Sequence, residues 1–153
     1  MLAAIAYSAN LKKRVALMNN TIAIIYYIKV QLEYLNMPVC DIIRKLCSNK
    51  SVTKPEFLSE CEKLISEGVD FPVAWESSVV QASYYKTDEK SELLHLGANL
   101  GTSNKENQIE IISSHKSAFE AFEIRAREKE QRYSKLSVAL SALIGCMFFI
   151  TVI

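Results

Sequence analysis

Glycine and proline are scarce in this 153-residue chain, which contains four glycines and three prolines. Turn-rich β-sandwiches and disordered chains use more of both, so the composition argues against these two classes. Neither sign of charge dominates, since 18 Lys and Arg balance 17 Asp and Glu for a net charge of +1. This balance argues against a strongly basic nucleic-acid binder, and we expect no nucleic-acid partner. The length allows one domain, or one domain with an appendage.

The sequence also lacks paired metal ligands and the common catalytic motifs. Its four cysteines form no C-x-x-C pair, and the two histidines, His95 and His115, are twenty residues apart. Structural zinc sites need ligands at short spacing, so we expect reduced thiols in helix cores, no metal and no cofactor. No Gly-rich phosphate loop, H-E-x-x-H or G-x-S-x-G motif is present. The sequence therefore predicts a protein that is not an enzyme.

Charge is absent from residues 136–153, LSVALSALIGCMFFITVI. As a helix this run would be roughly 27 Å long, close to the hydrocarbon thickness of a bilayer. Basic residues crowd the preceding flank, which the positive-inside tendency places in the cytoplasm: Arg125, Arg127, Lys129, Arg132 and Lys135. We therefore predict a C-terminal transmembrane helix. Ser141 and Gly145 form a small-xxx-small pair that would let another membrane helix approach closely.

The first seven residues, MLAAIAY, are apolar but too short to span a membrane. They are either the remnant of an N-terminal membrane segment or the start of the first soluble helix, and the sequence leaves both open. The expected organisation is therefore residues 1–7, a cytosolic helical bundle at 8–135, and the membrane helix at 136–153.

Every strong periodicity in the body is helical. Apolar residues recur at three- and four-residue steps over residues 9–35, which predicts one long helix. Pro38 suits the first turn of a short second helix. Thr53 and Glu56 form a T-x-x-E capping box for a third helix, and Gly68 is its expected stop.

The second half of the body shows the same punctuation. We expect Asp70 to cap a fourth helix ending near Lys86, and Asp88 to cap a fifth that stops at Gly101. Ser103 opens another capping box, and no breaker follows it until the apolar run. The sequence thus predicts an all-α fold: an antiparallel bundle of about six helices with a C-terminal transmembrane helix.

Two features of the body favour either tight packing or partner docking. Trp75, the single tryptophan, is either a core anchor or a partner-facing hot spot. Gly97 and Gly101 are one helical turn apart, and an interior glycine costs up to roughly 1 kcal/mol relative to alanine. Close helix contact or partner docking must offset that cost.

The order of three segments resembles the stage III sporulation protein AB family. The first segment runs from Gln31 to Val39 and resembles the family's E-I-x-Y-x-x-T-P-L pattern through Tyr34 and Pro38. The second runs from Phe57 through Gly68 to Trp75 and is similar to an F…L…G…A-W pattern. The third is similar to the L-G-x-x-L-G-x-S-D-x-x-G-Q motif, here called the Leu-Gly motif: Leu96, Gly97, Leu100, Gly101, Ser103 and Gln108.

The resemblance implies a part of the secretion-like transport complex between mother cell and forespore. The family is similar to the cytoplasmic domain of the type II secretion inner-membrane platform protein, so the implied role is a non-enzymatic scaffold. Its implied place is the mother-cell membrane around the forespore, with the bundle facing the cytoplasm. The implied partners are the sporulation ATPase and other membrane proteins of the complex, and a homo-oligomer is possible. A generic tail-anchored helical adaptor or coiled-coil tether unrelated to transport remains an alternative, although capped short helices differ from one long heptad run.

Overall fold

The computed structural model describes residues 2–51, 53–100 and 105–152 of the chain. These residues form helices and connecting segments without a strand, so the predicted all-α fold is confirmed. The helices of the described part are α1 (Leu2–Leu35), α2 (Val39–Ser48), α3 (Glu56–Ser66), α4 (Phe71–Gln81), α5 (Thr87–Leu100) and α6 (Lys105–Val152).

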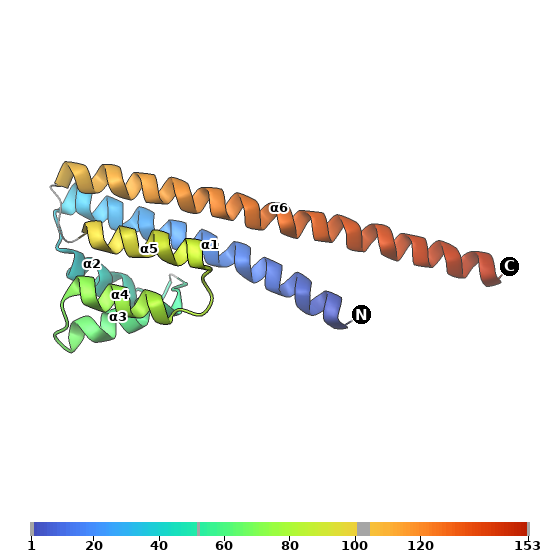
Figure 1. Cartoon of the computed structure of the whole chain (residues 1–153), viewed down its shortest axis with the longest axis horizontal. Helices are drawn as coiled ribbons and strands as arrows, with labels where there is room; N and C mark the ends of the chain where they lie inside the picture. The colour runs from blue at the N-terminus through green and yellow to red at the C-terminus, as the bar shows by residue number, and fades with distance from the viewer. Residues whose placement is uncertain (1, 52, 101–104, 153) are drawn as a thin grey trace.

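The two long helices, α1 and α6, pack side by side in antiparallel directions (Figure 1). The helix α5 packs on α6, and the short helices α2, α3 and α4 lie alongside in the half of the molecule where α1 finishes. The N-terminal end of α1 and the C-terminal end of α6 consequently leave the bundle on the same side. The C-terminal part of α6 extends well beyond α1, as Figure 1 shows.

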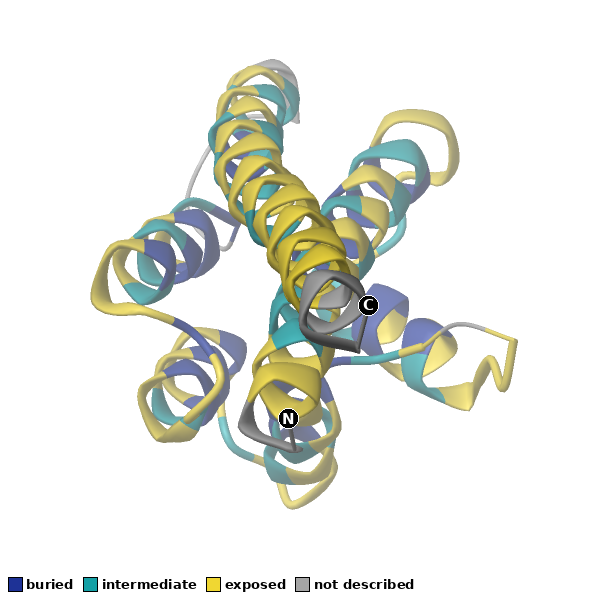
Figure 2. Ribbon diagram, turned by 90° about the vertical axis from the view of Figure 1, so that its right-hand side faces the viewer, coloured by how far each residue is buried: buried dark blue, intermediate teal, exposed yellow. Residues whose placement is uncertain are grey.

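The hydrophobic core draws buried side chains from every helix of the described part, and α1 and α6 contribute to it from the last half of α1 and the first half of α6. Met18, Ile25 and Ile28 of α1 are fully or almost fully buried, and α6 contributes Ile112 and Phe119. Figure 2 shows the buried residues facing the interior, whereas the residues of α6 from Ser134 to Ile144 are all exposed. Each buried large aliphatic side chain stabilises the fold by about 1.5–3 kcal/mol relative to exposure, so the core belongs to the bundle and not to the extension.

The end of α3 follows the sequence prediction. Gly68 has a φ of +92°, a left-handed conformation in which glycine avoids the strain of a side chain. Its N–H donates to the carbonyl of Ile65 at 3.1 Å, and the N–H of Val69 donates to the carbonyl of Leu64 at 3.0 Å. These two bonds form a Schellman motif, which satisfies the last carbonyls of the helix.

Two predicted capping interactions at α3 and α4 are wrong. Pro55 occupies the N-cap position of α3 without a side-chain hydrogen bond, so Thr53 forms no capping box. Asp70 does occupy the N-cap position of α4, but its side chain also makes no capping bond. The helix α4 ends at Gln81 and not near Lys86, because the chain turns there to bring a later tyrosine into the core.

The start of α5 uses a different carboxylate from the one predicted. The helix begins at Thr87, and Glu89 in its first turn accepts the backbone N–H of Lys86 at 2.9 Å. This bond is the acidic half of a capping box, in which the third helical residue reaches back to the N-cap N–H. Asp88, the predicted cap, lies exposed in the first turn and makes no such bond.

Residues 2–7 continue α1 without a break and contact α6. The rings of Tyr7 and Tyr133 pack edge to face with their centroids 4.7 Å apart. The hydroxyl of Tyr133 donates to the carbonyl of Ala4 at 3.3 Å. This end of α1 therefore pairs with α6 beyond the bundle.

The location of the candidate membrane span differs from the prediction. Among the residues that the structure describes fully, one helix is long and apolar enough to cross a membrane, and it is Ala4–Leu35 of α1. The predicted position of the membrane span at residues 136–153 is corrected accordingly. Several side chains of that run are not among those that the structure describes. The helix α1 qualifies because it combines 32 helical residues with a sufficient mean hydropathy. The core residues from Met18 to Leu32 supply much of that hydropathy from inside the bundle.

Candidate functional site

The Leu-Gly motif packs against the single tryptophan. Gly97 of α5 is buried, and a Cβ atom added to it would lie 2.1 Å from Cδ1 and 2.5 Å from Nε1 of Trp75 in α4. The indole Nε1 donates a hydrogen bond of 2.7 Å to the carbonyl of Leu93, one turn before Gly97. Glycine at this position therefore allows the indole to lie directly on the backbone of α5.

Aromatic rings enclose the other sides of the indole. The Trp75 ring packs edge to face on Phe57 with centroids 5.4 Å apart, and Phe71 lies at 5.6 Å. Phe57 also contacts Tyr85 at 5.7 Å. Trp75 is 2% exposed, so it is a core anchor between α3, α4 and α5 and presents no surface to a partner.

The rest of the described motif holds the end of α5. Leu96 and Leu100 are buried in the core. The side-chain amide of Gln108 in α6 donates to the carbonyl of Leu100, the last residue of α5, at 3.0 Å. This bond satisfies one of the carbonyls that a helix end leaves free and ties α6 to α5. Gly101 and Ser103, with their predicted stop and capping box, lie outside the described residues.

The remaining predicted residues do not join this cluster. Tyr34 is 74% exposed near the end of α1, and Pro38 is exposed just before α2. Gly68 ends α3. The hydroxyl of Ser141 donates to the carbonyl of Ser137 within α6 at 2.8 Å, and the surroundings of Gly145 lie outside the described part.

Sequence reasoning missed a polar network that ties α1 to the start of α5. Arg14 forms an ion pair with Glu89 and donates to the carbonyl of Tyr84 at 2.6 Å. Nearby, the hydroxyls of Thr21 and Tyr85 are 2.6 Å apart, and Thr21 donates to a carbonyl of its own helix. The tyrosine hydroxyl is therefore the donor. Arg14 and Thr21 are seven residues apart and therefore lie on one face of α1. This spacing is the signal in the sequence that both could bind the same neighbouring segment.

Burial keeps the Tyr85 phenol and the Cys61 thiol protonated. It raises the pKa of the Tyr85 hydroxyl above its ordinary value, and the bond to Thr21 offsets only part of this shift. Burial, with smaller contributions from Cys47, Cys40 and Glu62, raises the pKa of the Cys61 thiol to about 12. A protonated, buried thiol is a poor nucleophile and a poor metal ligand. Within the described part of the chain, no three His, Cys, Asp or Glu side chains lie close enough together to hold a metal ion.

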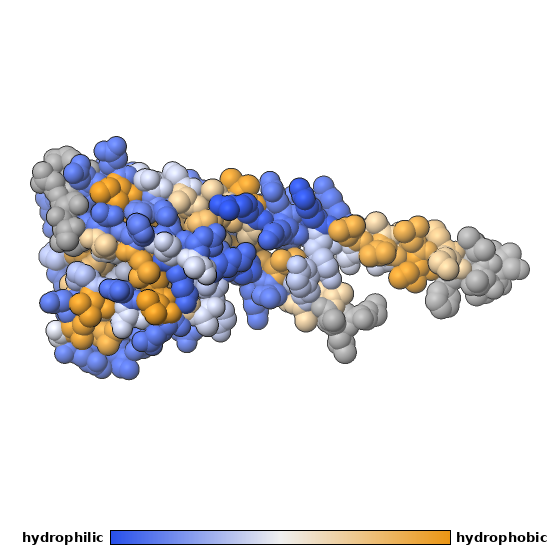
Figure 3. Space-filling model, in the orientation of Figure 1, coloured by the Kyte–Doolittle hydropathy of each residue, from blue (hydrophilic) through white to orange (hydrophobic). Residues whose placement is uncertain are grey.

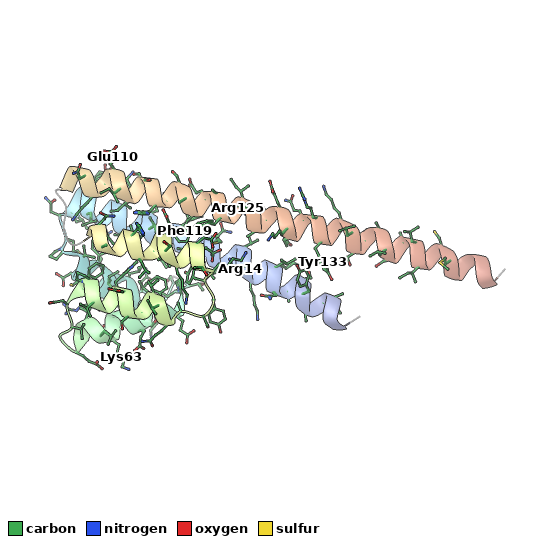
Figure 4. All side chains as sticks on the ribbon, viewed as in Figure 1. Arg14, Lys63, Glu110, Phe119, Arg125 and Tyr133 are labelled. Carbon is green, nitrogen blue, oxygen red and sulfur yellow. The ribbon has the colours of Figure 1, made fainter. Side chains whose placement is uncertain are left out.

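A cleft of about 480 Å³ opens where α1 and α6 leave the bundle, beside the first turn of α5. Its cationic side chains, which define what we call the cationic cleft, are Arg14, Lys86, Arg125, Lys129 and Arg132. Figure 4 shows Arg14 and Arg125 on the two neighbouring long helices, at the bundle end of the extension.

Comparison with protein families decides the identity. The family model described as stage III sporulation protein AB matches residues 1–153, the whole chain. The chain belongs to this family. The resemblance predicted from the three segments is thus confirmed, and the stage III sporulation protein AB member described here is a sporulation-related protein. Comparisons with curated proteins and with solved structures found no match.

Proposed function

We propose that this protein is a non-enzymatic, membrane-associated scaffold of the sporulation transport complex between mother cell and forespore. It works at the mother-cell membrane that surrounds the forespore, with its bundle in the cytosol. There it docks the sporulation ATPase and other membrane proteins of the same complex. Membership of the stage III sporulation protein AB family supports the sporulation role.

The observation that carries the proposal is the uneven distribution of apolar surface. The bundle buries most of its large aliphatic side chains, whereas the extended part of α6 exposes a row of them. Figure 3 shows this apolar extension beyond a hydrophilic middle section. The exposed side chains, each 58–70% accessible, are Leu136, Val138, Leu140, Leu143, Ile144 and Met147. Water disfavours an apolar surface of this extent, which supports association with a membrane.

The charges support the cytosolic orientation of the bundle. Basic residues of α6 lie between the bundle and the apolar extension, and they include Arg125, Lys129 and Arg132. Basic residues beside an apolar segment that associates with a membrane favour the cytoplasmic side. The bundle lies on the same side of the extension as these residues.

The outer face of α4 is the docking surface that we propose for the ATPase. Val73 and Val80 are 58% and 57% exposed, and two helical turns place them on the same face. Tyr84, just after α4, is 66% exposed. Tyrosine is enriched among the residues that anchor protein interfaces, and the two valines add apolar surface to this region.

Co-purification from sporulating cells tests the proposal. Tagged full-length protein should be found in the membrane fraction and should retain the ATPase encoded with it. The double variant Val73→Ser/Val80→Ser should lose the ATPase but remain in the membrane fraction. Ile124→Ser is the matched control, because Ile124 is also 55% exposed but lies on α6. Loss of the ATPase from the control, or its absence from the wild-type preparation, would contradict the docking surface; a wild-type protein in the soluble fraction would contradict membrane association.

A further inference from the structure

The cationic cleft carries more positive charge than its surroundings neutralise. Five cationic side chains and three carboxylates, Asp88, Glu89 and Glu128, line it, which leaves two net positive charges. Glu89 is engaged by Arg14 in an ion pair. The whole chain has a net charge of only +1, so this cleft concentrates positive charge that other surfaces offset.

Three of the cations are free to meet a ligand. Within the described part of the structure, the side chains of Lys86, Lys129 and Arg132 take part in no ion pair or hydrogen bond. Arg125 lies over the ring of Phe122 at 4.9 Å from its centroid, which fixes its guanidinium at the wall of the cleft. These groups approach from α6 and from the segment before α5, so an anion between them would contact two parts of the fold.

The same cleft has an apolar wall. Tyr7, Leu11, Phe122 and Ala126 line it together with the cations. Beyond the cleft, a hydrophilic section of α6 separates this wall from the exposed apolar extension (Figure 3). A small hydrated anion has no apolar part to contact this wall. An amphipathic anion would place its charged group among the cations and its apolar part along the wall.

We propose that the cationic cleft binds the phosphate of an anionic phospholipid headgroup, with the glycerol and acyl region lying along the apolar wall. A phosphodiester offers two acceptor oxygens to Lys129 and Arg132, and guanidinium and ammonium groups both form charge-assisted bonds to it. The proposal rests on the membrane association in the proposed function, because the lipid must reach the end of the bundle where α1 and α6 leave it.

Lipid retention by the full-length protein in a nonionic detergent tests the proposal. Native mass spectrometry would compare phosphatidylglycerol with phosphatidylcholine of the same acyl chains, so that only the headgroup charge differs. The variant Lys129→Gln/Arg132→Gln should lose about fivefold in phosphatidylglycerol retention for each removed charge, about 25-fold in all. Retention of phosphatidylcholine should not change. The matched control Lys50→Gln/Lys63→Gln removes the same charge from exposed positions outside the cleft, and Figure 4 shows Lys63 at the opposite end of the bundle.

Each outcome has a definite meaning. Preferential retention of phosphatidylglycerol that the cleft variant abolishes and the control keeps supports the proposal. Equal retention of both lipids, or unchanged retention by the cleft variant, overturns it. If inorganic phosphate raises the unfolding temperature and displaces phosphatidylglycerol at millimolar concentration, the cleft binds free anions and the lipid assignment is wrong. Circular dichroism confirms that the variants fold, and the membrane fraction measured in cells separates failure of this proposal from failure of the proposed function.

Discussion

Replacing Gly97 with alanine adds one methyl group at the closest contact between α4 and α5. The new Cβ would lie 2.1 Å from Cδ1 of Trp75, a separation that side-chain carbons do not adopt. The indole cannot move freely, because Phe57 and Phe71 pack on it and its Nε1 is bonded to the carbonyl of Leu93. The substitution must therefore displace the ring, break its hydrogen bond, or push α5 away from α4.

The size of the effect follows from three opposing contributions. Overpacking of a core costs about 1–3 kcal/mol, and a lost buried hydrogen bond costs about 1 kcal/mol. Alanine in a helix interior recovers about 1 kcal/mol relative to glycine. The net destabilisation should be about 2 kcal/mol, which corresponds to a decrease of about 4–8 °C in the unfolding temperature for a chain of this size.

A double-mutant cycle assigns the effect to the contact itself. Unfolding in urea, followed by far-ultraviolet circular dichroism, would compare Gly97→Ala, Trp75→Phe and the combined variant. The phenyl ring is smaller and has no Nε1, so Gly97→Ala should cost about 1 kcal/mol less in the Trp75→Phe background. Circular dichroism is needed because Trp75→Phe removes the only tryptophan.

Two results would refute this account. An unchanged or higher stability of Gly97→Ala would show that helix propensity outweighs the contact. An additive cycle would show that the indole is not what limits the space at residue 97. If the variant were as stable as wild type yet failed to retain the ATPase, Gly97 would belong to a docking surface and not to the core.

Three further predictions concern the rest of the body. Gly68→Ala should cost about 1 kcal/mol in a urea titration, because the φ of +92° is unfavourable for a side chain although no atom lies within 4 Å. Arg14→Gln should cost about 3 kcal/mol in the same titration, because it removes the cation that pairs with the buried Glu89 carboxylate. The double variant Arg14→Gln/Glu89→Gln should recover part of the lost stability, and equal stability of wild type and Arg14→Gln would contradict the network. Stability should fall as pH rises above about 9, because the Cys61 thiol and then the Tyr85 hydroxyl lose their protons in the unfolded chain at their ordinary pKa values of 9.0 and 10.0 but keep them when folded. Thermal unfolding at several pH values would show a smaller alkaline loss for Tyr85→Phe, and an unchanged loss would contradict its buried, protonated state.

The long helices could be predicted from the sequence because their signals are repeated many times. Apolar residues recur at helical spacing throughout residues 9–35, and no single position decides the pattern. The stop at Gly68 was also predictable, because few other residues adopt its conformation at low cost. These are local properties, and the structure agrees with them.

The end of α4 could not be predicted, because a distant contact decides it. Nothing in the sequence around Ala82 to Lys86 interrupts a helix, and the prediction extended α4 to that point. The helix ends at Gln81 because Tyr85 turns into the core, where its ring meets Phe57 and its hydroxyl meets Thr21 of α1. Thr21 is 64 residues away in the chain, so local patterns do not contain this information.

The Leu-Gly motif was partly predictable. The helical spacing of Gly97 and Gly101 indicated a close approach of another helix at Gly97. Trp75 stood out because it is the single tryptophan of the sequence. The sequence left open whether each residue served packing or docking. The structure shows that the two residues contact each other directly. Both therefore serve packing, because the absence of a Cβ at Gly97 leaves room for the Trp75 indole.

The basic residues near the two ends of the chain show how folding changes the meaning of charge. Lys12, Lys13 and Arg14 form one basic cluster in the sequence, but the structure separates their roles. Arg14 turns inward to the Glu89 carboxylate, whereas Lys12 and Lys13 remain exposed. Antiparallel packing of α1 and α6 then brings Arg14 beside basic residues more than a hundred positions later in the chain. A nearly neutral composition thus produces a positive cleft next to an apolar extension, and this juxtaposition, not the net charge, is what would select an anionic membrane surface.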